Sequence, residues 1–204
     1  MKIVRYIPDF LSDSFFFQIR SKIDYLKLLM NLCDLIFLQY PKSNKKVKFI
    51  KDKMNRVFIY RDGNFISTQF PFNIEFFDEL DIKIYTYSGN TIDNKSISAV
   101  KSLLNQFNSH TFVDLKHLEW DEEDDYLNEI GKEIIYELLL IEPSYIRYDH
   151  DPKNERGRIH PLHHFDINYS SNGVFKLGLS YQINEQYFED TMDTCTDSKF
   201  IEKE

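Results

Sequence analysis

The chain has 204 residues, of which 42% are hydrophobic and 16% aromatic, so it carries enough apolar material for a substantial core, and disorder is not expected. Its formal net charge of −8 argues against a protein that coats nucleic acid through global charge, although it allows a local basic patch. Cys33 and Cys195 show neither a disulfide framework nor a zinc spacing, which favours a reducing cytoplasm. The N-terminus lacks a continuous apolar signal core, and no run approaches the roughly 18 apolar residues of a membrane span, so we expect neither secretion nor membrane insertion.

The first half of the chain is predicted to contain a helix and a hairpin. From Ser12 or Ser14 onward, apolar residues recur at spacings of three and four, which is the period of a helix that buries one face, and Pro41 ends the pattern. Residues 57–60 and 65–67 flank Arg-Asp-Gly-Asn, and Asp-Gly is a strong hairpin turn signal. Residues 81–87 alternate as a further strand would. We therefore predict a β-hairpin near residues 55–68.

Two more helices are predicted in the middle of the chain. The first covers residues 97–107, and the second begins in the acidic run at 121–125, because free amides and the macrodipole favour negative charge at a helix N-terminus. Ile130, Ile134 and Leu138 supply the apolar stripe of the second helix, and Pro143 indicates an end near Glu142.

The last third is predicted to be β-rich, with strands in 144–151, 160–170 and 174–181 and a turn at 170–173 between the last two. The expected fold class is α+β, with an antiparallel sheet in the C-terminal third packed against helices. We expect a single domain over residues 1–204, with the N-terminal helix and hairpin in 1–90, helices in 95–142 and the C-terminal sheet in 143–190.

Strand alternation decides which polar residues of this third can act together, because successive side chains point to opposite faces. Arg147, Asp149, His164, Asp166 and Lys176 are predicted to share one face, together with Asp151. His163 is predicted to point the other way, toward the core, which favours a structural role for its ring. The core face is expected to hold Ile146, Tyr148, Phe165, Ile167, Tyr169, Phe175, Leu177 and Leu179.

The polar face suits three kinds of chemistry, and a solvated sheet face without function is the alternative to all of them. In metal-independent RNA cleavage, a histidine acts as acid or base, an aspartate orients its ring and a cation stabilises phosphate charge. Docking of a partner needs no chemistry at all. The candidate catalytic residues are Arg147, Asp149, His160, His164 and Asp166.

A divalent metal held by His160, His164 and a carboxylate is the remaining chemistry. It requires both histidines on one strand face, which holds only if Pro161 introduces no bulge. The sequence also lacks the phosphate-loop, HExxH and CxxC signatures. We therefore assign no metal ligands and predict no cofactor.

The segments Tyr-Ile-Arg-Tyr-Asp-His-Asp-Pro at 145–152 and His-Pro-Leu-His-His-Phe-Asp-Ile at 160–167 resemble the signature of an uncharacterised bacterial domain-of-unknown-function family of similar length. The motif is also similar to that of TumE-type toxins of toxin–antitoxin systems. This resemblance covers residues 145 to about 179 and implies a phage-defence or stress setting with nuclease-like toxicity. It points to Arg147, Tyr148, Asp149, His160, Pro161 and His164, with Asp166 where relatives often carry histidine.

The leading functional hypothesis is a cytoplasmic defence or toxin protein whose polar sheet face binds or cleaves RNA or another phosphate-bearing ligand, as a ribonuclease-like hydrolase would. Basic side chains interleaved with aromatic ones fit a nucleic-acid backbone, and a solvated loop is the other interpretation of the lysine-rich segment. The candidate nucleic-acid-binding residues are Lys45, Lys46, Lys48, Arg56 and Lys176. The alternative hypothesis is a non-catalytic interaction subunit, such as a sensor, inhibitor or neutralising partner encoded in the same operon.

Overall fold

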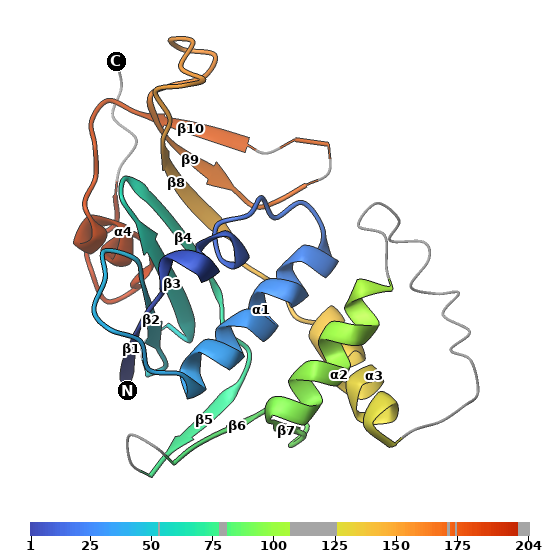
Figure 1. Cartoon of the computed structure of the whole chain (residues 1–204). Helices are drawn as coiled ribbons and strands as arrows, with labels where there is room; N and C mark the ends of the chain where they lie inside the picture. Colours follow the sequence, from blue (N-terminus) through green and yellow to red (C-terminus); the bar gives the residue numbers. More distant parts are fainter. Residues whose placement is uncertain (53, 78–80, 107–125, 171, 174, 200–204) are drawn as a thin grey trace.

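The computed structural model describes residues 1–52, 54–77, 81–106, 126–170, 172–173 and 175–199. Its main element is an antiparallel sheet of seven strands in the order β1-β2-β3-β4-β8-β9-β10 (Figure 1). The strands are β1 (Lys2–Tyr6), β2 (Lys46–Ile50), β3 (Arg56–Arg61), β4 (Asn64–Gln69), β8 (Ile146–His150), β9 (His163–Ile167) and β10 (Phe175–Leu179). The predicted α+β class is confirmed. The C-terminal strands extend the sheet of the N-terminal half, because β8 pairs with β4.

Helices and a small second sheet make up the other elements of the described chain. The helices are η1 (Asp9–Ser14, a 3-10 helix), α1 (Lys22–Phe37), α2 (Asn94–Asn105), α3 (Tyr126–Leu139) and α4 (Glu185–Met192). The small antiparallel sheet contains β5 (Asn73–Phe76), β6 (Ile82–Tyr85) and β7 (Thr91–Ile92). Within the described residues, no helix is both long and apolar enough to cross a bilayer.

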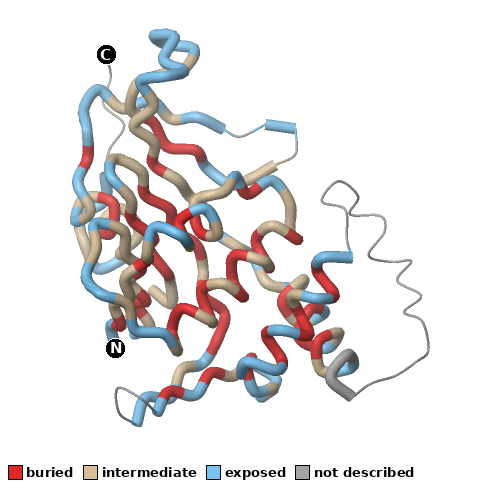
Figure 2. The backbone as a smooth tube through the Cα atoms, viewed as in Figure 1, coloured by how far each residue is buried: buried red, intermediate tan, exposed pale blue. Residues whose placement is uncertain are grey.

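Both faces of the large sheet are packed. On one face, Val47, Ile59 and Ile66 belong to the main core together with the apolar side of α1. On the other face, Phe58 and Phe65 pack against Phe188 of α4. Figure 2 shows buried residues running through α1 and the central strands, whereas the segment before β9 and much of β10 are exposed.

The predicted start of the first helix at Ser12 or Ser14 is wrong. Helix α1 begins after Ser21, whose side chain accepts from the amide of Asp24 while Asp24 accepts from the amide of Ser21. This capping box fixes the helix N-terminus there. Phe15 and Ile19 are buried without belonging to an α-helix, so their spacing reflects tertiary burial.

Other predicted elements are confirmed more closely. The hairpin is β3–β4, with Gly63 in the left-handed region at φ 68°. The strand near 81–87 is β6, and α2 and α3 match the two middle helices, although α3 ends at Leu139, before Glu142. The acidic run at 121–125 and the predicted helix end at residue 107 lie outside the described residues. The lysine-rich segment contains strand β2 in place of a loop.

Candidate functional site

Strands β8, β9 and β10 bring five of the sequence-predicted residues together on one sheet face. Arg147 pairs with Asp166, which pairs with Lys176, and Asp149 pairs with His164. Directly paired residues share a face, so the alternation predicted from the sequence holds for all five. This face continues the one that α1 covers, since Ile66 pairs with Arg147. We call Arg147, Asp149, His164, Asp166 and Lys176 the polar network.

Two cations and two carboxylates of the polar network are joined by short contacts. Nη2 of Arg147 lies 2.7 Å from Oδ2 of Asp149 and 2.7 Å from Oδ2 of Asp166. Nζ of Lys176 lies 2.7 Å from Oδ1 of Asp166 and 2.8 Å from Nε2 of His164. Both oxygens of Asp166 therefore accept from a cation, and the formal charges of the four ionised groups cancel.

The contacts of His164 define its tautomer. Nδ1 lies 2.8 Å from the carbonyl oxygen of Pro161, which can only accept, so Nδ1 carries the proton. Nε2 then accepts from Lys176 and lies 3.8 Å from Oδ2 of Asp149 and 3.7 Å from Oδ1 of Asp166. Burial lowers the pKa of His164, and the charge of Lys176 lowers it further against the opposing hydrogen bond to Pro161. Because the ammonium of Lys176 can only donate, its contact with Nε2 leaves that nitrogen unprotonated.

The polar network is buried at its centre and reaches solvent at its rim. His164 and Asp166 are 0% and 2% exposed, whereas the side chains of Asp149, Arg147 and Lys176 are 14%, 21% and 27% exposed. Burial raises the pKa of Asp149, although the attraction of Arg147 opposes the shift. The centre of this sheet face is therefore buried, whereas the alternative considered from the sequence was a solvated sheet face.

Several residues of the predicted core face are more exposed than the centre of the polar network. Ile167 is 41% and Phe175 79% exposed, while Tyr148 and Phe165 are buried against the α4 side. Tyr169 follows Asn168, whose φ of 62° ends the alternation, and packs against the main core on the other side. The prediction of a uniform core face is wrong at these positions.

Tyr145, two residues before Arg147, adds a buried hydroxyl beside the polar network. Its pKa is raised to about 12, first by burial, and its hydroxyl interacts electrostatically with Arg147, Asp149 and Asp166. This hydroxyl and Nε of Arg147 are both buried, and neither makes a hydrogen bond of good geometry in the described part of the chain, although the two side chains interact with each other. Its spacing of two from Arg147 on a strand is the sequence signal that places Tyr145 on this face.

His163 and His160 lie outside the polar network, and His163 points to the opposite sheet face as predicted from the sequence. There, Nδ1 of His163 is 3.0 Å from the Tyr148 hydroxyl and the ring stacks on His150. His160 lies before β9, and its Nε2 is 3.2 Å from Oδ2 of Asp151, away from the carboxylates of the network. Its ring meets that of His164 edge-on, with centroids 4.9 Å apart. Asp151 therefore pairs with His160 and not with the network.

Of the predicted nucleic-acid-binding residues, Lys176 belongs to the polar network, whereas Lys45, Lys46, Lys48 and Arg56 lie elsewhere on the protein. Lys46 and Lys48 lie on the α4 side of β2, where both contact Glu185 and Lys48 also contacts Glu189. Lys45 pairs with Asp9 at 2.8 Å. These three lysines thus already have acidic partners, and their binding of nucleic acid stays a prediction.

Arg56 differs from the three lysines. Its guanidinium donates to the hydroxyls of Ser67 and Ser144, and no carboxylate in the described part of the chain pairs with it. Burial lowers its pKa to about 10. It borders a cavity of about 530 Å³ at the strand ends that is lined by Arg56, Glu142, Pro143, Ser144, Tyr145, Ile146, Ile167, Asn168, Tyr169 and Met192.

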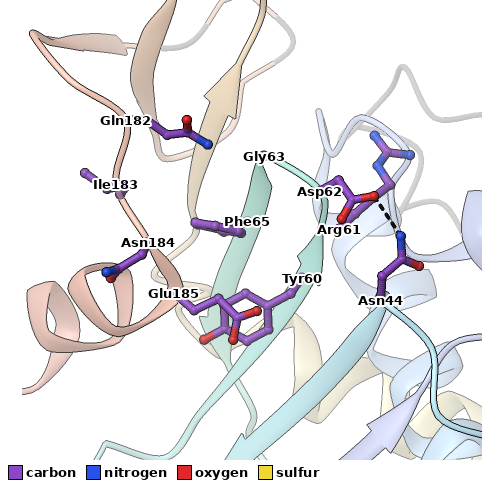
Figure 3. A pocket seen from close by; sticks show the side chains of 10 residues that line it. All are labelled: Asn44, Tyr60, Arg61, Asp62, Gly63, Phe65, Gln182, Ile183, Asn184 and Glu185. Carbon is purple, nitrogen blue, oxygen red and sulfur yellow. Dashed lines mark hydrogen bonds between the residues drawn. The ribbon is translucent and has the colours of Figure 1, made fainter.

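A second cavity, of about 440 Å³, lies on the α4 side between the β3–β4 turn and the chain leading into α4 (Figure 3). Nδ2 of Asn44 donates to Oδ2 of Asp62 across its rim at 2.7 Å. None of the candidate site residues lines it. The cavity and the polar network are therefore separate features.

Comparison with protein-family models, curated proteins and solved structures finds no match to the chain. The function is therefore inferred from the geometry of the polar network.

Proposed function

We propose that the polar network binds and cleaves a phosphodiester, with RNA as the substrate, in the defence or toxin setting that the motif resemblance implies. The observation that carries this proposal is the convergence of Arg147, Asp149, His164, Asp166 and Lys176 through the register of three strands. Cations, carboxylates and an imidazole in one partly buried group are what phosphoryl chemistry uses. A purely structural ion pair would not need the neutral imidazole at its centre.

The positions of the groups suggest a division of roles. Arg147 and Lys176 are the more exposed members, and a phosphate can reach them from solvent. A phosphate that attracts Lys176 would draw its ammonium away from His164 and Asp166, which are buried beneath the rim. Cleavage requires that the attacking oxygen loses a proton and that the leaving oxygen takes one from solvent water when its bond to phosphorus breaks. We propose that Asp149, His164 and Asp166 provide the group that activates the attacking oxygen.

The test measures cleavage of a labelled RNA by the purified full chain and by its Asp149→Asn variant. Asp149 is the rim carboxylate, so its amide keeps the shape while removing the charge, and we expect at least about a 100-fold loss of cleavage. Asp151→Asn is the matched control, because Asp151 contacts Asn154 and His160 outside the network. Equal activity of the two variants, or no binding and no cleavage of RNA by the parent protein, would refute the proposal.

A second candidate is a non-catalytic interaction subunit. The observation that favours it is the edge strand β10, whose Phe175 is 79% exposed. An open edge with exposed apolar side chains suits a protein partner. If this function is the biological one, Phe175→Lys abolishes toxicity or protection in cells whereas Asp149→Asn leaves it unchanged. The opposite pattern supports the phosphodiester function.

A further inference from the structure

We propose that Asp149, His164 and Asp166 form a binding site for a divalent metal cation, and that the ammonium of Lys176 occupies this position when the cation is absent. The ligands would be one carboxylate oxygen from each aspartate and Nε2 of His164. One imidazole and two carboxylates suit Mn²⁺ or Zn²⁺. The site differs from the one considered from the sequence, because it uses Asp149 and leaves His160 outside.

The distances fit a common cation. One ligand atom from each of the three residues lies within 4.8 Å of the other two. A cation bound at about 2.1 Å to each ligand needs ligand atoms no more than about 4.2 Å apart. The separations of Nε2 of His164 from the two carboxylates, 3.8 and 3.7 Å, already meet this limit. Small rotations of the two aspartate side chains would bring the carboxylate oxygens of Asp149 and Asp166 within the same limit.

The orientation of His164 is that of a metal ligand. Metal-binding histidines usually donate their second ring N–H to a carbonyl or carboxylate, which fixes the tautomer and directs the lone pair. Nδ1 of His164 donates to the carbonyl of Pro161, and Nε2 faces the two aspartates. The imidazole would therefore not need to turn before its Nε2 met a cation.

Lys176 marks the place of a positive charge. Its ammonium contacts Nε2 of His164 and Oδ1 of Asp166 at once, which are two of the three proposed ligand atoms. Its side chain is 27% exposed and can therefore swing into solvent when a cation takes these contacts. Arg147 holds Oδ2 of both aspartates and keeps them converged.

Two buried polar atoms lie beside the site. Within the described residues, the Tyr145 hydroxyl and Nε of Arg147 are inaccessible and make no hydrogen bond of good geometry, although the two side chains interact with each other. Buried polar groups in native proteins are nearly always paired with protein or ordered water. A cation with three protein ligands would retain open positions for water or a phosphate oxygen.

This inference rests on the proposed function only where it concerns catalysis: the cation would be the activating group, and the released Lys176 would contact the phosphate. Metal binding itself is measured without RNA. The full chain, freed of metal with EDTA and dialysed, is titrated with Mn²⁺, and free Mn²⁺ is followed by its electron paramagnetic resonance signal. The titration is repeated with Zn²⁺ against a chromophoric chelator.

We expect the parent protein to bind one cation and the Asp149→Asn and Asp166→Asn variants to bind it at least about 10-fold more weakly. Asp151→Asn is the control and should bind as the parent does. Lys176→Met should bind about fivefold more tightly, because no internal cation has to be displaced. A gain of affinity cannot result from unfolding, so this variant keeps the test decisive even if Asp166→Asn folds poorly.

The metal site is refuted if neither Mn²⁺ nor Zn²⁺ binds to the parent or to Lys176→Met, or if the two aspartate variants bind as tightly as the parent. RNA cleavage that persists in EDTA would support the proposed function and show that cleavage does not need the metal. Metal binding at these residues without RNA cleavage would support the metal site and refute the proposed function.

Discussion

The ammonium of Lys176 lies 2.8 Å from Nε2 of His164, although His164 has no exposed surface. A rim side chain thus reaches the buried centre of the polar network and also pairs with Asp166, which is 2% exposed. Removing a partner from a buried carboxylate costs free energy, because the desolvated charge keeps fewer compensating contacts. Lys176 should therefore contribute to stability as well as to the site.

We predict that Lys176→Met lowers the free energy of unfolding by about 1–3 kcal/mol, less than the loss of a fully buried pair, because Arg147 still neutralises Asp166. Urea unfolding followed by circular dichroism measures the change. Lys153→Met is the control, since Lys153 is exposed and should change stability by less than about 0.5 kcal/mol. Equal effects of the two substitutions would show that the contacts of Lys176 carry no stability.

The ion pairs that hold α4 to β2 predict a dependence on pH. Burial alone would raise the pKa of Glu185, but hydrogen bonds and attraction from Lys46 and Lys48 outweigh it and lower the pKa below its ordinary value of 4.5. A carboxylate whose pKa is lower in the folded state than in the unfolded state stabilises the protein at pH values above the unfolded-state pKa. This stabilisation is lost as the pH falls through the folded-state pKa. As the pH falls below about 4.5, the contribution of Glu185 should therefore decrease, and it should be lost once the pH is below the folded-state pKa.

The measurement compares the unfolding free energy of the parent protein and of Glu185→Gln between pH 3 and pH 7. We expect a difference of at most about 1 kcal/mol at neutral pH, because Glu185 is about a third exposed, and a smaller difference at pH 3. A difference that grows on acidification would contradict the assignment.

Phe188 anchors α4 on the sheet face opposite the polar network. It is fully buried, and its ring lies 6.0, 5.7 and 6.1 Å from those of Phe58, Phe65 and Phe165. Phe188→Ala should lower the unfolding free energy by about 3–5 kcal/mol, through lost burial and the cavity left behind. Phe175→Ala, at an exposed position, should change it by less than about 0.5 kcal/mol. Thermal unfolding of both variants tests this, and similar losses would contradict the assigned packing.

Local sequence patterns predict those parts of the fold that short-range physics determines. Asp62-Gly63 specifies the β3–β4 turn, because the turn needs a residue that tolerates positive φ. Alternation assigns Arg147 and Asp149 to one face of β8, and His164 and Asp166 to one face of β9, whatever the strand order, since it depends only on the backbone of each strand.

Features that depend on distant contacts are not predictable in this way. Lys46 and Lys48 look like a solvated or nucleic-acid-binding segment, but their acidic partners on α4 lie far along the chain; the contact of Lys48 with Glu189 spans 141 positions. The orientation of His164 depends likewise on the chain before β9, because its Nδ1 donates to the carbonyl of Pro161. Periodicity shows which way a side chain points, but not what covers it.

Gly178, which pairs with His164 in the register, shows how closely the Pro161 turn packs on β10. A Cβ at Gly178 would lie 2.9 Å from Cγ of Pro161, a contact that the rigid proline ring cannot relieve by rotation. Gly178→Ala should therefore push the turn outward and move the carbonyl that accepts from Nδ1 of His164. We predict a loss of about 1–3 kcal/mol in unfolding free energy from this overpacking.

The effect on the site separates this substitution from general destabilisation. Gly131→Ala is the matched control, because a Cβ there would lie 2.8 Å from Leu103 in the contact between α2 and α3. Both variants should lose stability, but Gly178→Ala alone should weaken Mn²⁺ binding, by about 10-fold, since the orienting contact of a metal ligand is disturbed. Calorimetric titration below the melting temperature of each variant measures this. Unchanged Mn²⁺ affinity in Gly178→Ala would show that the carbonyl of Pro161 does not orient His164 for binding.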